Sequence, residues 1–104
     1  MKRNATYTVQ DNFEAANMTS LQGYITTDYA TLVETFGESL GGGDKTTQEW
    51  ILVGEDGTVA TIYDWKQYET PMHKCEWHIG GRDYKAVELV QDALMGYAKQ
   101  LEKV

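Results

Sequence analysis

Cysteine, proline and long apolar runs are all scarce in this sequence of 104 residues. The one cysteine, Cys75, cannot form an internal disulfide, which fits a reducing cytoplasm. A single proline in a chain that is 41% apolar and 12% aromatic excludes collagen-like, low-complexity and disordered proteins. No apolar run approaches the roughly 18 residues of a membrane-spanning helix, so we expect no membrane partner. The basic start, Met1–Thr6, is not followed by an apolar stretch, so we expect no secretory signal.

Basic residues are nearly missing from the first two-thirds of the chain. Between Asn4 and Trp65 the sequence has ten acidic residues and one basic residue, Lys45, whereas six of each follow from Lys66 onward. The net charge of −7 disfavours a protein that holds nucleic acid through its phosphates. The asymmetry has two explanations, which are solubility and a surface complementary to a basic protein partner.

Apolar periodicity predicts a strand and then a helix in the first half of the chain. The segment from Leu21 to Ile25 alternates between two faces, as a strand does. Thr27-Asp28 can supply the N-cap of a helix, and Gly37 can end it. Residues 1–17 have no clean period and are expected to form an arm or an edge strand. The stripe at i, i+3, i+4 and i+7 of the helix consists of Tyr29, Leu32, Val33 and Phe36.

Three further strands and a second helix are predicted after the glycines at 41–43. The continuously apolar segment Trp50–Val53 is typical of a central strand. The turn Gly54–Gly57 leads from it to a return strand over Val59–Trp65. Cys75–Ile79 forms the third strand, and Asp83 can cap the helix that follows. The core stripe of that helix is Ala86, Leu89, Val90, Ala93, Leu94, Tyr97 and Leu101.

These elements predict one α+β domain over residues 1–104. Short connections between sequential strands favour an antiparallel sheet of four or five strands, in the order β-α-β-β-β-α with both helices on one face. Helices on one face leave rings on the other face partly exposed. Exposed aromatic rings beside carboxylates are typical of a protein-binding surface, because an RNA-binding one would need lysine and arginine around the rings.

Residue types that carry catalysis or bind metals do not form a coherent set. His73, Cys75 and His78 are zinc-ligand types, but strand alternation separates His78 from the other two, so we expect no metal site. His78 and Asp64 are both expected on the non-aromatic faces of their strands. A hydrogen bond between them would orient a general base or satisfy a half-buried histidine. Because no nucleophile is marked, we expect neither an enzyme nor a cofactor.

The motif Gly80-Gly81-Arg82 lies between a predicted strand and a predicted helix. Its backbone N–H groups could hold an anion, with Arg82 supplying positive charge. The spacing matches neither the P-loop nor the dinucleotide-binding pattern. The motif is therefore interpreted either as a tight turn or as an anion-binding site for a nucleotide.

Five segments within residues 18–94 carry a resemblance. They are 19–25 (TSLQGYI), 29–38 (YATLVETFGE), 44–47 with 49–50 (DKTT and EW), 56–66 (DGTVATIYDWK) and 77–81 (WHIGG). They resemble a family of small proteins, without established activity, that tailed bacteriophages encode. The resemblance implies a viral accessory protein in the cytoplasm of a bacterial host. Small acidic phage proteins often bind and disable host factors, including defence nucleases.

We therefore expect an accessory protein that binds and inhibits a host protein with a basic surface, such as a CRISPR or other defence nuclease. Direct nucleic-acid binding is not expected, and a homodimer is left open. The alternatives are a small-molecule or nucleotide-binding protein that sequesters a defence signal through Gly80, Gly81 and Arg82, and a virion or structural accessory protein. The residues expected to contact the host protein are Glu34, Glu38, Asp44, Glu49, Glu55, Asp56, Tyr63 and Trp65.

Overall fold

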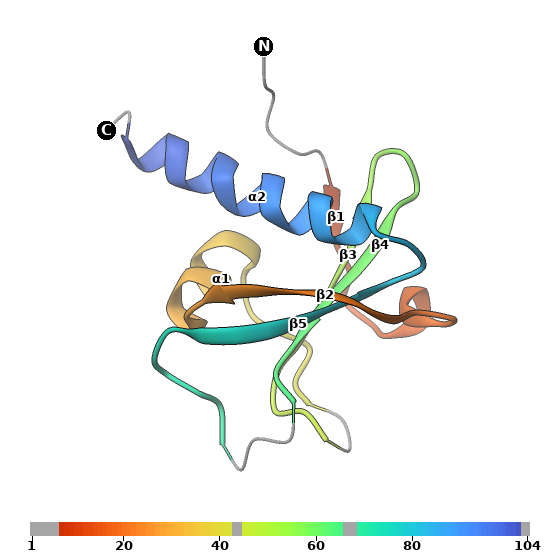
Figure 1. Ribbon diagram of the computed structural model, residues 1–104, viewed down its shortest axis with the longest axis horizontal. Coiled ribbons are helices and arrows are strands. Elements are labelled where there is room, and N and C mark those ends of the chain that lie inside the picture. Colours follow the sequence, from red (N-terminus) through yellow and green to blue (C-terminus); the bar gives the residue numbers. More distant parts are fainter. Residues whose placement is uncertain (1–6, 43–44, 66–68, 103–104) are drawn as a thin grey trace.

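A five-stranded antiparallel sheet and two helices make up the fold in a computed structural model, which describes residues 7–42, 45–65 and 69–102 (Figure 1). Of residues 97–102 only the backbone is described. The strands lie in the order β1-β3-β4-β5-β2, and every neighbouring pair is antiparallel. The elements are β1 (Tyr7–Val9), η1 (Glu14–Ala16), β2 (Ser20–Thr27), α1 (Tyr29–Phe36), β3 (Glu49–Gly54), β4 (Val59–Tyr63), β5 (Cys75–Gly81) and α2 (Lys85–Glu102).

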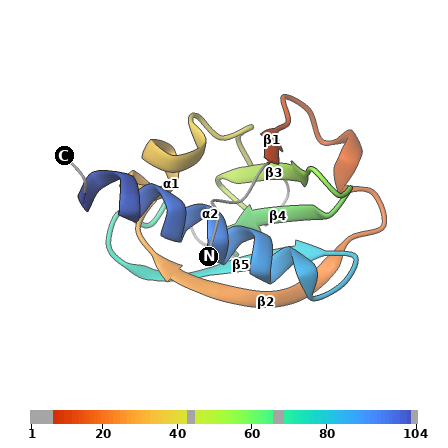
Figure 2. The ribbon, with the colours of Figure 1, turned by 90° about the horizontal axis from the view of Figure 1, so that it is seen from above.

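The structure confirms the predicted α+β class, with the larger of the two expected numbers of strands, five. The fifth strand is β1, which pairs with β3 through Tyr7 and Gly54 at one edge of the sheet. This pairing makes residues 7–9 of the N-terminal segment an edge strand. Both helices lie on the same face, with α2 running across the sheet (Figure 2).

Local signals explain the limits of α1. The carboxylate of Asp28 accepts a hydrogen bond from Thr31 N at 2.8 Å, so it satisfies one of the N–H groups that a helix start leaves unpaired. Gly37 has a φ of 87°, in the left-handed region that glycine tolerates, and ends the helix. Leu32 and Phe36, one turn apart, are buried against the sheet.

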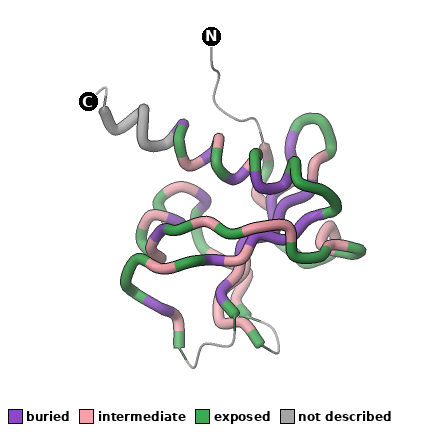
Figure 3. The backbone as a smooth tube through the Cα atoms, in the orientation of Figure 1, coloured by how far each residue is buried: buried purple, intermediate pink, exposed green. Residues whose placement is uncertain are grey.

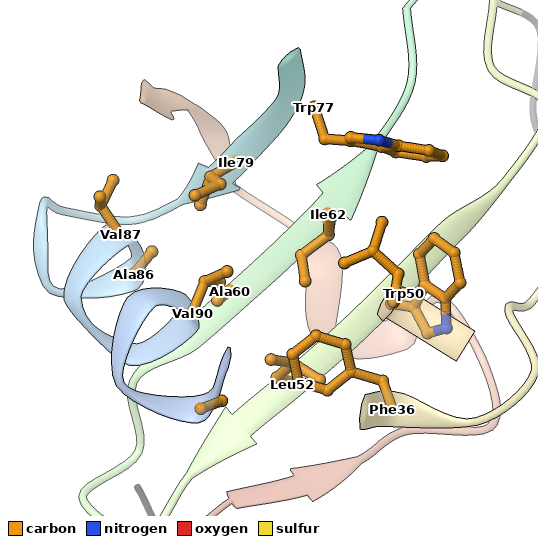
Figure 4. Packing of buried hydrophobic residues seen from close by; sticks show 12 residues of the cluster. Phe36, Trp50, Leu52, Ala60, Ile62, Trp77, Ile79, Ala86, Val87 and Val90 are labelled. Carbon is orange, nitrogen blue, oxygen red and sulfur yellow. The ribbon is translucent and has the colours of Figure 1, made fainter. Parts of the chain in front are cut away.

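The main core lies between the sheet and the two helices (Figure 4). Alternate residues of β3, β4 and β5 point into it, and each fully buried large side chain contributes about 1.5–3 kcal/mol to folding. Trp50 and Trp77 meet edge to face with ring centroids 5.8 Å apart. The indole N–H of Trp50 donates to the carbonyl of Gly37 at 2.8 Å, which ties β3 to the end of α1. The sheet residues of this core are Trp50, Leu52, Ala60, Ile62, Trp77 and Ile79.

Helix α2 closes the core with a stripe slightly different from the predicted one. Ala86, Val90 and Ala93 are buried as predicted, but Val87 is buried as well. It packs where Gly23 has no side chain, since a Cβ there would lie 2.8 Å from Val87 Cγ2. Leu89 and Leu94 are partly buried against the core, whereas the side chains of Tyr97 and Leu101 lie outside the described part. Among the described residues, no helix has the length and apolarity to span a membrane.

The opposite face of the sheet is covered at one end only. Buried positions follow the inner strands β3 and β4, and they include Ile51, which faces away from the helices and is fully buried (Figure 3). The short helix η1, which the sequence analysis did not predict, packs against β3 and β4 on this face. The other end of the face carries no such cover from the described elements, and we call it the open face.

Candidate functional site

Four side chains form a row across four strands of the open face. Tyr24 on β2 is paired with His78 on β5, His78 with Tyr63 on β4, and Tyr63 with Glu49 on β3. Because residues paired across antiparallel strands project from the same face, the row runs from an edge tyrosine to a carboxylate. We call Tyr24, His78 and Tyr63, together with Trp65 just beyond β4, the aromatic row.

The rings of the aromatic row contact one another. Tyr63 stacks on His78 with centroids 5.4 Å apart and an interplanar angle of 30°, and Tyr24 meets His78 edge-on at 5.0 Å. Trp65 lies 6.1 Å from His78 and 6.2 Å from Tyr63. Tyr24 is 46% exposed and Trp65 41% exposed. The row thus combines mutual packing with exposed aromatic surface, a composition that is enriched in protein interfaces.

His78 lies at the centre of the row. Its Nδ1 atom is buried and has no hydrogen-bond partner among the described residues, and burial lowers the pKa of the imidazole against the opposing effects of Glu76 and Asp64. The neutral ring therefore acts as part of the apolar surface near pH 7. As predicted, His78 lies on the face of β5 opposite Trp77, but the β4–β5 register places it beside Tyr63 rather than beside Asp64.

The predicted pairing of His78 with Asp64 does not form. Asp64, the residue after β4, is 2% exposed, and its carboxylate instead accepts from Thr47 N at 2.7 Å, Thr47 Oγ1 at 2.6 Å and Gln48 N at 3.1 Å. Since the Thr47 hydroxyl donates to Asp64, it must accept from Thr70 Oγ1, 2.7 Å away. Thr70 in turn accepts from Gln48 Nε2 at 3.1 Å. Asp64 is therefore the acceptor on which a chain of loop hydrogen bonds ends.

This hydrogen-bonded chain places two groups beside the open face. Asp64 binds the backbone N–H and the hydroxyl of Thr47, and Thr46 directly precedes Thr47 in the chain. Trp65 directly follows Asp64. Asp64 thus fixes the loop before β3 against the end of β4. Its role here is to position residues, without contact to an imidazole base.

A cavity of about 220 Å³ adjoins the end of the row at Glu49. It lies between the open face and the segment that carries η1. Thr46 Oγ1 donates to Glu49 Oε2 at 2.9 Å. Burial raises the pKa of Glu49 above its ordinary value, partly offset by the Thr46 hydrogen bond, while the charge of Asp64 adds to the rise. The lining residues are Ala16, Thr19, Ser20, Thr46, Glu49, Thr61, Tyr63, Trp65 and Gly80.

The residues predicted to contact a partner do not lie on one surface. Glu49, Tyr63 and Trp65 meet at the cavity. Glu55 and Asp56 lie in the turn at the far end of β3, where hydrogen bonding from Thr58 and then the charge of Lys85 lower the pKa of Asp56.

The remaining predicted contact residues lie elsewhere. Glu34 and Glu38 are exposed on and just after α1, the helix that packs on the opposite face, and Asp44 lies outside the described residues. The sequence analysis did not count Tyr24, His78 and Glu76 among the contact residues, because only the cross-strand register brings them together on the open face. Alternation within a single strand could not reveal that register.

The predicted anion-binding turn is not formed. Gly80 and Gly81 lie inside β5, paired with β2 and β4, and Arg82 Nη2 donates to the carbonyl oxygens of Ala15 and Asn17 at 3.4 and 3.3 Å. Close packing explains the glycines instead. A Cβ on Gly80 would lie 2.5 Å from Thr61 Oγ1, so this glycine keeps the floor of the cavity open.

The three residues of zinc-ligand type, His73, Cys75 and His78, lie in different environments. His73 is exposed in the loop before β5, and Cys75 is partly buried at the start of that strand. Within the part of the chain that the structure describes, no three His, Cys, Asp or Glu side chains are grouped to hold a metal ion.

No family model, curated protein or solved structure matches this chain. A proposal about function must therefore rest on the side chains of the open face.

Proposed function

We propose that this chain is a binding protein that holds a basic segment of another protein against the aromatic row. The supporting observation is the row of Tyr24, His78, Tyr63 and Trp65, which is exposed at Tyr24 and Trp65 and ends at the Glu49 carboxylate. Rings with low side-chain entropy provide contact area, and the acidic chain favours a basic partner. The net charge of −7 accelerates the encounter with such a partner.

The resemblance to phage proteins extends this proposal to the identity of the partner. A bacterial host protein with a basic surface, such as a defence nuclease that binds nucleic acid, would be bound in the host cytoplasm and inhibited by occupation of its basic groove. No catalytic step is needed for this activity.

Partner capture with matched surface variants tests the proposal. Immobilised protein is exposed to bacterial lysate at low and high salt, as wild type, as Tyr24→Ser and as Trp65→Ser. Tyr84→Ser is the control, because Tyr84 is an exposed tyrosine next to α2, on another part of the surface. We expect one retained protein that both row variants lose, the control retains and high salt weakens. Retention by the row variants, or indifference to salt, would contradict the proposal.

A nucleotide ligand fits the observed geometry less well. Arg82 already donates to backbone carbonyls, and the carboxylate of Glu49 at the cavity would repel phosphate. Thermal-shift measurements with nucleotides should give no stabilisation, whereas a saturating ligand would add about 4 kcal/mol at roughly 1,000 times its Kd.

A further inference from the structure

The cavity next to the aromatic row offers the groups that recognise an organic cation. It has one carboxylate, from Glu49, and two aromatic rings, from Tyr63 and Trp65. Four hydroxyl-bearing residues complete the polar lining, namely Thr19, Ser20, Thr46 and Thr61. No basic side chain is among the lining residues in the part of the chain that the structure describes, so this lining places no cation beside the negative charge of Glu49.

Glu49 is held in place for such a ligand. It is the cross-strand partner of Tyr63, and Thr46 Oγ1 donates to its Oε2 atom at 2.9 Å. One hydrogen bond leaves further acceptor sites on a carboxylate. A cation that reaches the cavity would therefore find a carboxylate with one oxygen already fixed and a ring on the adjacent strand.

The acceptor groups and the rings of the cavity favour a guanidinium over an ammonium ion as the ligand. A guanidinium has five N–H donors in a plane, which suits a carboxylate surrounded by hydroxyl oxygens, and its flat face stacks on aromatic rings. An ammonium has three donors and is more strongly hydrated, so its transfer into the cavity is less favourable. A ring beside a cation strengthens its binding, because the negative face of the ring attracts the charge.

We infer that this cavity binds an arginine side chain of the partner protein, with its guanidinium on Glu49 and its plane against Tyr63 or Trp65. The inference rests on the proposed function, since the same partner segment would continue from the cavity along His78 to Tyr24. It adds the chemical identity of the anchoring residue. Gly80 is part of the site, because a side chain there would meet Thr61 at the cavity floor.

A titration with short peptides tests the inference, with the NMR signal of the Trp65 indole N–H as the readout. The probes are acetyl-Gly-Arg-Gly-amide, the same peptide with citrulline or lysine in place of arginine, and free L-arginine. We expect a saturable shift with the arginine peptide and at least tenfold weaker binding of the other three. Glu49→Gln should weaken the binding of the arginine peptide at least tenfold, although its side chain can still accept the Thr46 hydrogen bond. Glu55→Gln, a matched change in the β3–β4 turn, should leave the binding of the peptide unchanged.

Equal binding of citrulline or lysine, no saturable shift, or no effect of Glu49→Gln would overturn the inference. Free arginine that binds as tightly as the peptide would reassign the cavity to a small molecule and overturn the partner assignment. The partner captured by the wild type separates this inference from the proposed function. If Glu49→Gln retains the partner while Tyr24→Ser loses it, the arginine site is wrong and the binding function stands.

Discussion

Replacement of Asp64 by alanine should destabilise the protein and loosen the cavity together. The substitution removes the acceptor of three hydrogen bonds, from Thr47 N, Thr47 Oγ1 and Gln48 N. It leaves two backbone N–H groups and one hydroxyl without their acceptor. The loop before β3 would then lose its attachment to the end of β4.

The magnitude follows from the three contacts. Hydrogen bonds to a charged group contribute about 1.5–3 kcal/mol each, and an unsatisfied buried group costs about 1–3 kcal/mol. Thr47 and Gln48 are partly accessible, so water can replace some of the lost bonds. We expect a loss of about 2–4 kcal/mol, a large part of the 5–15 kcal/mol typical of a domain, and a Tm lowered by roughly 10–20 °C.

Asp64→Asn provides the matched comparison. Its amide oxygen can still accept both backbone N–H groups, and its amide nitrogen can donate to Thr47 Oγ1, which reverses the direction of the hydroxyl chain. This variant should lose only about 1 kcal/mol. Urea unfolding followed by tryptophan fluorescence measures both. A loss below about 1 kcal/mol for Asp64→Ala, or equal losses for the two variants, would refute the positioning role of Asp64.

Three further predictions follow from the packing and the titrating groups. Gly81→Ala should lower stability by about 1–3 kcal/mol in urea unfolding, because its Cβ would overlap with Ala86 Cβ; unchanged stability would contradict the packing described for β5 and α2. Trp50→Phe should cost about 1.5–3 kcal/mol in the same assay through the lost bond to Gly37 O and the smaller ring, and a neutral effect would exclude that bond. The folded state holds the pKa of His78 below its ordinary 6.5, so the free energy of unfolding should decrease as the pH falls below about 6.5 toward the pKa of the folded state. The decrease should be smaller in His78→Phe. The same slope in both proteins would contradict the burial of this imidazole.

Signals local in sequence predicted most of the fold. The N-cap at Asp28, the positive φ of Gly37 and the apolar stripe between them define α1, because each depends on residues within a few positions of one another. The same holds for the hairpin of β3 and β4, in which Gly57 adopts the positive φ of the turn. Helix η1 had no comparable periodic signal, since one turn of three residues is too short to show one.

The site depended on relations between distant residues. Tyr24 and His78 are paired although 54 positions separate them in sequence, because β5 lies between β4 and the edge strand β2, and no local pattern specifies this register. Charge counting was similarly limited. The chain is acidic, but the described carboxylates among the predicted contact residues divide among the region of α1, the hairpin turn and the open face. Composition carries no information about which face a residue reaches.

The most direct test of the central claim is a footprint of the bound partner on this chain. Hydrogen exchange and side-chain NMR signals would be compared between the free protein and its complex with the partner that the capture experiment retains. The account predicts protection and shifts at Tyr24, Tyr63, Trp65 and His78, with little change on the exposed side of α2. A footprint centred on α2 or on the β3–β4 turn, with the aromatic row unchanged, would contradict it.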